Sequence, residues 1–243
     1  MEWRSWSGRL KSELRLDSEP VAVTFAGAAA AAGRAAHGKV SVCQALRRAS
    51  QGEFIAITVE TCGCPGGLVS LGLGQTPAAG RERLVDFLVN KEKVYCSRLA
   101  IHRGQQTVAA PVGVGTHVFF APLAQADILP DLVAFIGRAG TLHRVIGLAS
   151  YWDGGSIKAE LTGPACRTGI TYPAVTGEIG VSLLDFGARR LARFGEDQLL
   201  VSVPLHRMIH VMHALEEGAG GVAEEALEQV ERQIEELGPV EAV

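Results

Sequence analysis

The sequence lacks a long apolar run, and it lacks an excess of basic residues. A membrane-spanning helix needs about 20 consecutive apolar residues, and no uninterrupted apolar run approaches that length. The 23 lysines and arginines are outnumbered by 26 acidic residues, which gives a net charge of −3. A chain without a basic tail is not expected to bind nucleic acid. We therefore expect neither nucleic acid nor a membrane among its partners.

The sequence also lacks the apolar core of a secretory signal peptide, because charged residues are spread over positions 1–16. We therefore expect a cytoplasmic protein. Cysteine is scarce, with 5 residues, and an odd number cannot pair completely in disulfides within one chain. In the reducing cytoplasm, thiol chemistry or metal binding explains these cysteines better than disulfides, and plain packing in the core is the alternative.

What the sequence does contain is an alternation of strand-like and helix-like segments. With 47% apolar residues it can bury a sizeable core. Short apolar runs predict strands at 20–25, 54–59, 116–123, 130–137, 156–161, 179–184 and 198–203. Amphipathic stretches predict helices at 3–16, 41–52, 81–90, 141–150, 185–194, 204–217 and 222–237. Strands that alternate with helices predict an α/β fold with a mixed, largely parallel sheet.

Three regions follow from this pattern. They are an N-terminal helix at 1–16, an α/β core at 17–203 and a C-terminal helical segment at 204–243. Within the core, two strand–helix–strand halves at about 20–67 and 130–167 can be aligned with one another. We therefore predict that the sheet is built from two pseudo-repeated halves.

The alignment of the two halves has a consequence for the cysteines. His143 becomes the counterpart of Cys43, and the loops TCGCPGG and TGPAC become counterparts of each other. Loops that are equivalent by pseudo-symmetry can face each other across the joint between the halves. The repeat therefore predicts that Cys64 lies close to Cys166.

Four of the cysteines form the leading candidate site. Thiolates are the ligands that iron–sulfur clusters and zinc prefer, and a closed site needs four of them. The predicted ligands are Cys43, Cys62, Cys64 and Cys166. Gly66 and Gly67 would let backbone N–H groups approach the sulfur atoms. The first hypothesis is therefore an iron–sulfur, or other thiolate-ligated, redox or cofactor-handling protein with an electron-transfer partner.

Two other classes of function stay open. In the first, no metal is bound, and Cys64 acts as a nucleophile with a lowered pKa on its glycine-rich loop. In the second, the protein is a non-catalytic assembly subunit whose cysteines only fill the core. Its C-terminal helix, with one apolar stripe, would then bind a partner or a second copy of the chain.

Charged and histidine residues in the second half of the chain offer further candidates. Arg189 could bind a small anionic substrate with both guanidinium nitrogens. Asp185 stands where an N-cap would precede the helix at 185–194. Two of three histidines at helical spacing could instead chelate a metal, although packing beside an apolar stripe is the stronger explanation; the three are His206, His210 and His213.

Several blocks of the sequence together resemble a known family. These blocks are LDSEPVAVTF, VCQALRRASQGE, CPGGLVSLGLG, FFAPLAQADILPDLVAFIG and CRTGITYPAVTGEIGVSL followed by GARR. They are similar to the prokaryotic family called domain of unknown function 169, and the resemblance covers about 16–204. Because no activity is firmly established for that family, the resemblance implies positions of interest rather than a reaction.

The resemblance separates typical from untypical cysteines. It implies that the cysteine-bearing blocks of the family fall on Cys43, on Cys64 with the glycines that follow it, and on Cys166. Cys62 and Cys96 are less typical. Members of the family often have Gln in the block of His143 and Cys close to the position of Asp185, so the ligand set of this chain need not equal that of its relatives.

Overall fold

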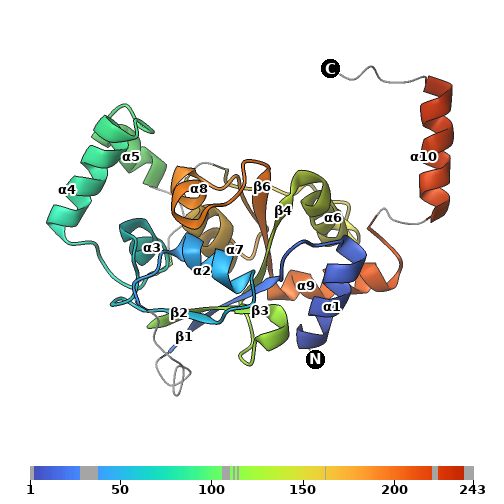
Figure 1. Cartoon of the computed structure of the whole chain (residues 1–243), viewed down its shortest axis with the longest axis horizontal. Coiled ribbons are helices and arrows are strands. Elements are labelled where there is room, and N and C mark those ends of the chain that lie inside the picture. Colours follow the sequence, from blue (N-terminus) through green and yellow to red (C-terminus); the bar gives the residue numbers. More distant parts are fainter. Residues whose placement is uncertain are drawn as a thin grey trace.

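The structure of this protein is a computed structural model, shown in Figure 1. It describes residues 3–27, 38–105, 110–111, 113, 115–161, 163–220 and 224–237. The helix predicted at 222–237 therefore begins two residues outside the described part of the chain.

The described residues form one sheet of six strands. The strands are β1 (Val21–Ala26), β2 (Ile55–Ile57), β3 (His117–Pro122), β4 (Leu132–Arg138), β5 (Gly180–Ser182) and β6 (Gln198–Pro204). Their order across the sheet is β2-β3-β1-β4-β6-β5. Each pair of neighbours is antiparallel.

The expectation of a largely parallel sheet is therefore wrong. A helix between two strands favours a parallel pair only when those strands become neighbours. Here β1 and β2 do run in the same direction, because each is antiparallel to β3, but β3 lies between them. In the same way β6 lies between β4 and β5. The alternation of strand-like and helix-like segments predicted the types of the elements. Whether neighbouring strands are parallel or antiparallel was decided by pairing between strands that are far apart in the sequence.

The sheet consists of two three-stranded units with the same topology. In each unit the last strand of the sequence is inserted between the first two, and the units join through the antiparallel pair β1–β4. The sequence repeat between 20–67 and 130–167 stays a prediction. The helices that directly follow β1 and β4 lie on opposite faces of the sheet, since α2 (Val42–Ala49) and α6 (Ala139–Ser150) belong to different core clusters.

Helices cover both faces of the sheet (Figure 1). The first face is covered by α2, α8 (Phe186–Ala192) and the π-helical turn η4 (Arg167–Thr171). The start of α3 (Pro65–Ser70) lies close to them. On the second face lie α1 (Trp3–Leu14), α6 and α9 (Leu205–Glu216). Alternate residues of β1 serve the two cores, because Val21 and Val23 face the first and Ala22 faces the second.

Two parts of the chain extend from this body in Figure 1. One consists of α4 (Ala78–Asp86), the π-helical η2 (Phe87–Lys91) and α5 (Arg98–Gln105). The other is α10 (Glu224–Leu237), in which Val230 and Ile234 are 48% and 54% exposed. The short helices η3 (Leu123–Gln125) and α7 (Tyr172–Thr176) complete the elements described.

Local signals in the sequence explain several boundaries. Ser41 accepts a hydrogen bond from the Gln44 backbone N–H, and the Gln44 side chain accepts one from the Ser41 N–H, which forms the capping box of α2. The strand predicted at 156–161 is wrong, since this segment is irregular. No helix within the described ranges is long and apolar enough to cross a membrane.

Candidate functional site

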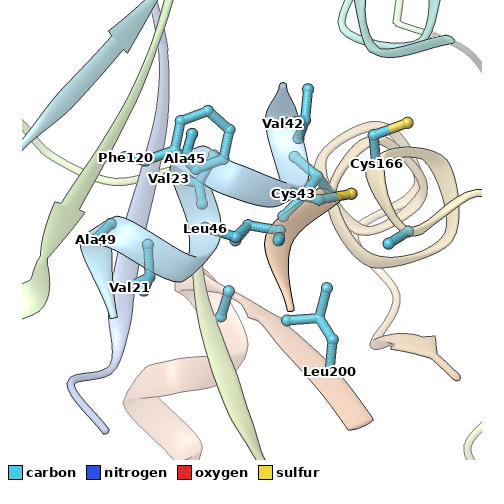
Figure 2. Packing of buried hydrophobic residues seen from close by; sticks show 14 of the residues in the cluster. Val21, Val23, Val42, Cys43, Ala45, Leu46, Ala49, Phe120, Cys166 and Leu200 are labelled. Carbon is cyan, nitrogen blue, oxygen red and sulfur yellow. The ribbon is translucent and has the colours of Figure 1, made fainter. Parts of the chain in front are cut away.

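Four cysteines from three separate segments meet on the first face of the sheet. Cys43 lies in the first turn of α2, and Cys166 directly precedes η4. In Figure 2 these two residues lie at the same end of the buried cluster, with Cys43 directed towards the segment that carries Cys166. Cys62 and Cys64 lie in the loop before α3 and pack against the same cluster. All five cysteines of the chain are free thiols.

Backbone pairing holds the cysteine loop against the start of α2. The Val40 N–H donates to the Thr61 carbonyl at 3.0 Å, and the Gly63 N–H donates to the Val40 carbonyl at 2.8 Å. A Cβ atom on Gly63 would lie 3.1 Å from the Val40 backbone, so this close approach favours glycine. These backbone contacts hold the loop, with Cys62 and Cys64, against the start of α2.

The sulfur atoms of Cys62 and Cys64 lie over the backbone of Gly67. A Cβ atom at Gly67 would stand 2.7 Å from the Cys64 sulfur and 3.6 Å from the Cys62 sulfur. The Cys62 thiol is also within 3.4 Å of the Cys64 carbonyl oxygen. Gly66, in contrast, has open space where its Cβ would be. Only the second glycine of the pair is needed to make room for the two sulfurs.

This arrangement stabilises a thiolate at Cys64. The pKa of Cys64 is lowered to about 6, and the adjacent Cys62 thiol is the largest cause of this shift. The backbone N–H groups of Val42 and Gly67 lower this pKa as well, whereas burial opposes them. The bond to Cys64 in turn raises the pKa of Cys62. The two neighbouring thiols therefore favour a single negative charge, at Cys64.

The two deeper cysteines are protonated thiols. Burial raises the pKa of Cys166 to about 12 and raises that of Cys43 well above its usual range. The Cys166 thiol lies 3.7 Å from the hydroxyl oxygen of Ser70. The Thr171 hydroxyl donates to the Ser70 carbonyl at 2.8 Å and so ties η4 to the end of α3. Cys166 therefore joins the segment around Cys64 through α3.

Asp185 connects the cysteine centre with α8. Its carboxylate accepts from the Ala188 N–H at 3.0 Å, which confirms the predicted N-cap. Its other oxygen accepts from the Ala165 N–H at 2.6 Å, next to Cys166. The charge of Asp185 raises the pKa of Cys64, although less than the hydrogen bonds lower it. The sequence indicated the cap but not this second contact.

The four residues around the centre occupy equivalent places in the two three-stranded units. Cys64 is the N-cap of the helix that follows β2, and Asp185 is the N-cap of the helix that follows β5. Cys43 and Cys166 each stand at the beginning of a helical segment between the first two strands of their unit. The cysteine centre therefore lies between the two three-stranded units, and each unit contributes residues from equivalent positions.

A buried ion pair adjoins Cys166 and was not found from the sequence. Arg167 Nη2 lies 3.4 Å from Glu160 Oε1, and the two side chains are only 6% and 16% exposed. Gly163, at φ +129°, packs directly against the guanidinium and leaves no space for a Cβ atom. The order Glu, Gly, Arg gives no recognisable pattern in the sequence, because the three meet only through the fold of this loop.

Other predicted residues lie away from the centre. The Arg189 guanidinium donates to the carbonyls of Leu183, at 2.8 Å, and Gly195, and it lies near Glu196. These partners all belong to its own segment, and binding of an anion by Arg189 stays a prediction. Cys96 is exposed beside α5.

Across the ranges described here, no three His, Cys, Asp or Glu side chains form a group that could hold a metal ion. The histidines of α9 therefore form no such group with one another. The four cysteines converge, but a shared metal would require their side chains to turn.

Comparisons with known proteins agree with one another. The sequence profile of the family DUF169, described as uncharacterised ArCR, matches residues 9–214. A protein of Methanocaldococcus jannaschii named uncharacterized protein MJ0308 is 24% identical over 167 residues, which cover 65% of this chain and 68% of that protein. No solved structure matches the chain.

Proposed function

We propose, for a chain that belongs to the DUF169 family, that Cys64 is the preformed thiolate of an enzyme or binding protein that acts on a small electrophilic molecule without a bound metal. The observation that carries this proposal is the position of the Cys64 sulfur, which lies over the Gly67 backbone beside the Cys62 sulfur, where the pKa of Cys64 is lowered. A reduced thiol centre of this kind fits a cytoplasmic location.

The state of Cys64 suits a nucleophile. With a pKa of about 6, this thiol is mostly ionised near pH 7, so no separate general base has to remove its proton. Cys64 is only partly buried, whereas Cys43 and Cys166 are buried. In the proposed step, the sulfur gives an electron pair to an electrophilic atom of the substrate, and the leaving group departs with the pair of the broken bond. Cys62 is the positioning residue that keeps the sulfur ionised.

Alkylation under reducing conditions tests this proposal. A time course with iodoacetamide at pH 7, followed by peptide mass spectrometry, should label Cys64 first and fastest. Cys64→Ser should remove the fast phase, whereas Cys96→Ser, which changes an exposed thiol outside the centre, should leave it intact. Five thiols that react slowly at similar rates would contradict the proposal.

The convergence of four cysteines supports a second candidate, which is an iron–sulfur or other thiolate-ligated centre with an electron-transfer partner. The lowered pKa of Cys64 is caused by other groups than Cys43 and Cys166, so nucleophilic catalysis alone does not explain the position of these two residues. With their side chains turned inward, the four sulfurs would supply the full ligand set of a cluster. The N–H groups near Cys64 would then tune the cluster through hydrogen bonds.

Anaerobic reconstitution with iron and sulfide distinguishes the two candidates. A cluster would give near-stoichiometric iron and acid-labile sulfide, and absorbance near 400 nm that dithionite bleaches. Both Cys64→Ser and Cys166→Ser should lose it, and Cys96→Ser should keep it. A colourless, iron-free protein after reconstitution would overturn this second candidate and leave the thiolate proposal standing.

A further inference from the structure

A small basic cavity lies between α2 and α8, beside the cysteine centre. Its volume is about 260 Å³. Val40 lines the cavity together with polar and charged residues, which are Lys39, Gln44, Arg47, Arg48 and Arg193. Four of these are cations, and no carboxylate is among the described residues that line the cavity. The volume is somewhat below the roughly 300–1,000 Å³ that is typical of sites for larger organic ligands.

The cationic side chains that line this cavity differ in whether an acidic residue forms an ion pair with them. Arg48 is bound by Glu53, whose carboxylate lies 2.6 Å from Nη2. Arg47, Lys39 and Arg193, by contrast, form no ion pair with any residue of the described ranges. Three positive charges that converge without a partner repel one another, and an anion between them would remove that cost.

Arg47 is held in place by an aromatic ring. Its guanidinium carbon lies 5.7 Å from the centre of the Phe194 ring, and Phe194 is buried. Stacking on a ring fixes the plane of a guanidinium while its N–H groups stay available at the edge. The edge of such a group matches the oxygens of phosphate or carboxylate. Arg47 is therefore ordered before any ligand arrives.

We propose that this cavity binds a small polyanion of the phosphate or carboxylate type. Arg47, Lys39 and Arg193 would supply the positive charge that holds this anion. The cavity adjoins the cysteine centre, because Val40 lines it and also pairs through its backbone with Thr61 and Gly63. The binding of the anion does not depend on Cys64 being a nucleophile, so the two proposals can fail separately.

The backbone at Arg193 offers a variant that removes charge without loss of fold. Arg193 has φ 55°, a left-handed conformation that glycine adopts more readily than arginine. Arg193→Gly should therefore keep or raise stability while it removes one cation of the cavity. Arg15 has φ 53° and lies at the end of α1, outside the cavity. Arg15→Gly is then a matched control that changes the same charge in the same backbone conformation.

Isothermal titration calorimetry at constant ionic strength tests the site, with pyrophosphate and citrate as probes and chloride as the reference salt. We expect saturable binding of pyrophosphate, citrate or both, and the stronger probe identifies the class of anion. Arg193→Gly and Arg47→Ala should each weaken binding roughly tenfold or more, as expected for lost charge-assisted hydrogen bonds. Arg15→Gly and Cys64→Ser should bind as the parent protein does.

Two results would overturn the proposal. One is the absence of saturable binding of either probe to the parent protein. The other is an equal loss in Arg193→Gly and Arg15→Gly, which would mean that the anion responds only to the net charge of the chain. Because Arg193→Gly is compatible with the native backbone, its thermal unfolding curve separates lost binding from lost fold.

Discussion

The two pairs of cysteines in this protein have the same chemistry and opposite surroundings. Cys62 and Cys64 lie partly exposed on a glycine-containing loop, where one thiol and two N–H groups are aimed at one sulfur. Cys43 and Cys166 lie in the core, where burial is the largest influence on each. The pKa values of Cys64 and Cys166, about 6 and about 12, lie on either side of the ordinary thiol. Donors around the sulfur, rather than the residue type, decide which cysteine is an anion.

The largest expected effect is the difference in reactivity between the two pairs. At pH 7, a thiol with a pKa near 6 is about nine-tenths ionised, whereas one with a pKa near 12 is ionised to about one part in 10⁵. Because only the thiolate is alkylated and burial slows access further, Cys64 should react at least about a thousand times faster than Cys166. Peptide-resolved alkylation rates measure this ratio. Rates within tenfold of each other would remove the distinction between the pairs.

Replacement of Cys62 should reduce the difference in reactivity between Cys64 and the buried cysteines. Cys62→Ala takes away the largest cause of the low pKa of Cys64, so the pH at which Cys64 becomes reactive should rise by about 1 or more. Cys62→Ser keeps an O–H donor and should shift this midpoint much less. The measurement is the alkylation rate of Cys64 between pH 5 and 9. An unchanged midpoint in Cys62→Ala would mean that the two N–H groups alone hold the thiolate.

The adjacent glycines of the loop provide a matched pair for stability. Gly67→Ala would place a Cβ atom 2.5 Å from a methyl carbon of Val42 and 2.7 Å from the Cys64 sulfur. We expect a loss of about 1–3 kcal/mol in the free energy of unfolding, as in other overpacked sites. Gly66→Ala meets no atom within 4 Å, and it should be neutral or stabilise the helix by up to about 1 kcal/mol. Urea denaturation of both variants checks this, and equal losses would contradict the close packing over Gly67.

Cys64 should also oppose the two buried cysteines in the pH dependence of stability. Cys64 has a lowered pKa in the folded state, so its stabilising effect is complete above the ordinary thiol pKa and is lost as the pH falls towards 6. Cys43 and Cys166 have raised values, so above a pH of about 8.5 they ionise only in the unfolded chain and stability falls. Under reducing conditions, Cys64→Ser should flatten the rise from pH 6 to about 8.5. Cys166→Ala should instead weaken the fall at higher pH.

Deletion of the C-terminal helix should have the smallest effect on the reactivity of the cysteines. Val230 and Ile234 of α10 are about half exposed, and α10 extends from the body in Figure 1. If this stripe holds two copies of the chain together, deletion of residues 221–243 should convert the dimer into a monomer and leave the alkylation of Cys64 unchanged. Light scattering gives the number of chains per particle, and the alkylation assay gives the reactivity of Cys64. A number of chains per particle that does not change would count against an oligomer through α10.

Much of the local structure could be predicted from local signals. Short apolar runs indicated β1, β4 and β6, and an amphipathic stretch indicated α2. The strand predicted at 156–161 was wrong because a few apolar residues there resembled a strand, although among the described residues this segment belongs to no sheet. The turn η4 carries no pattern that separates it from a loop, so the helical setting of Cys166 could not be predicted.

The sequence by itself determined the elements, the family and the cysteines that deserve study, because periodicity, caps and motif blocks are local properties of the chain. Only the tertiary structure decided that β3 and β6 are inserted between the strands of their units, since hydrogen-bonded pairing joins residues far apart in sequence. It also decided which thiol is the anion. That choice depends on where the Cys62 thiol and the N–H groups of Val42 and Gly67 point, and the amino-acid sequence does not record the direction of a hydrogen bond.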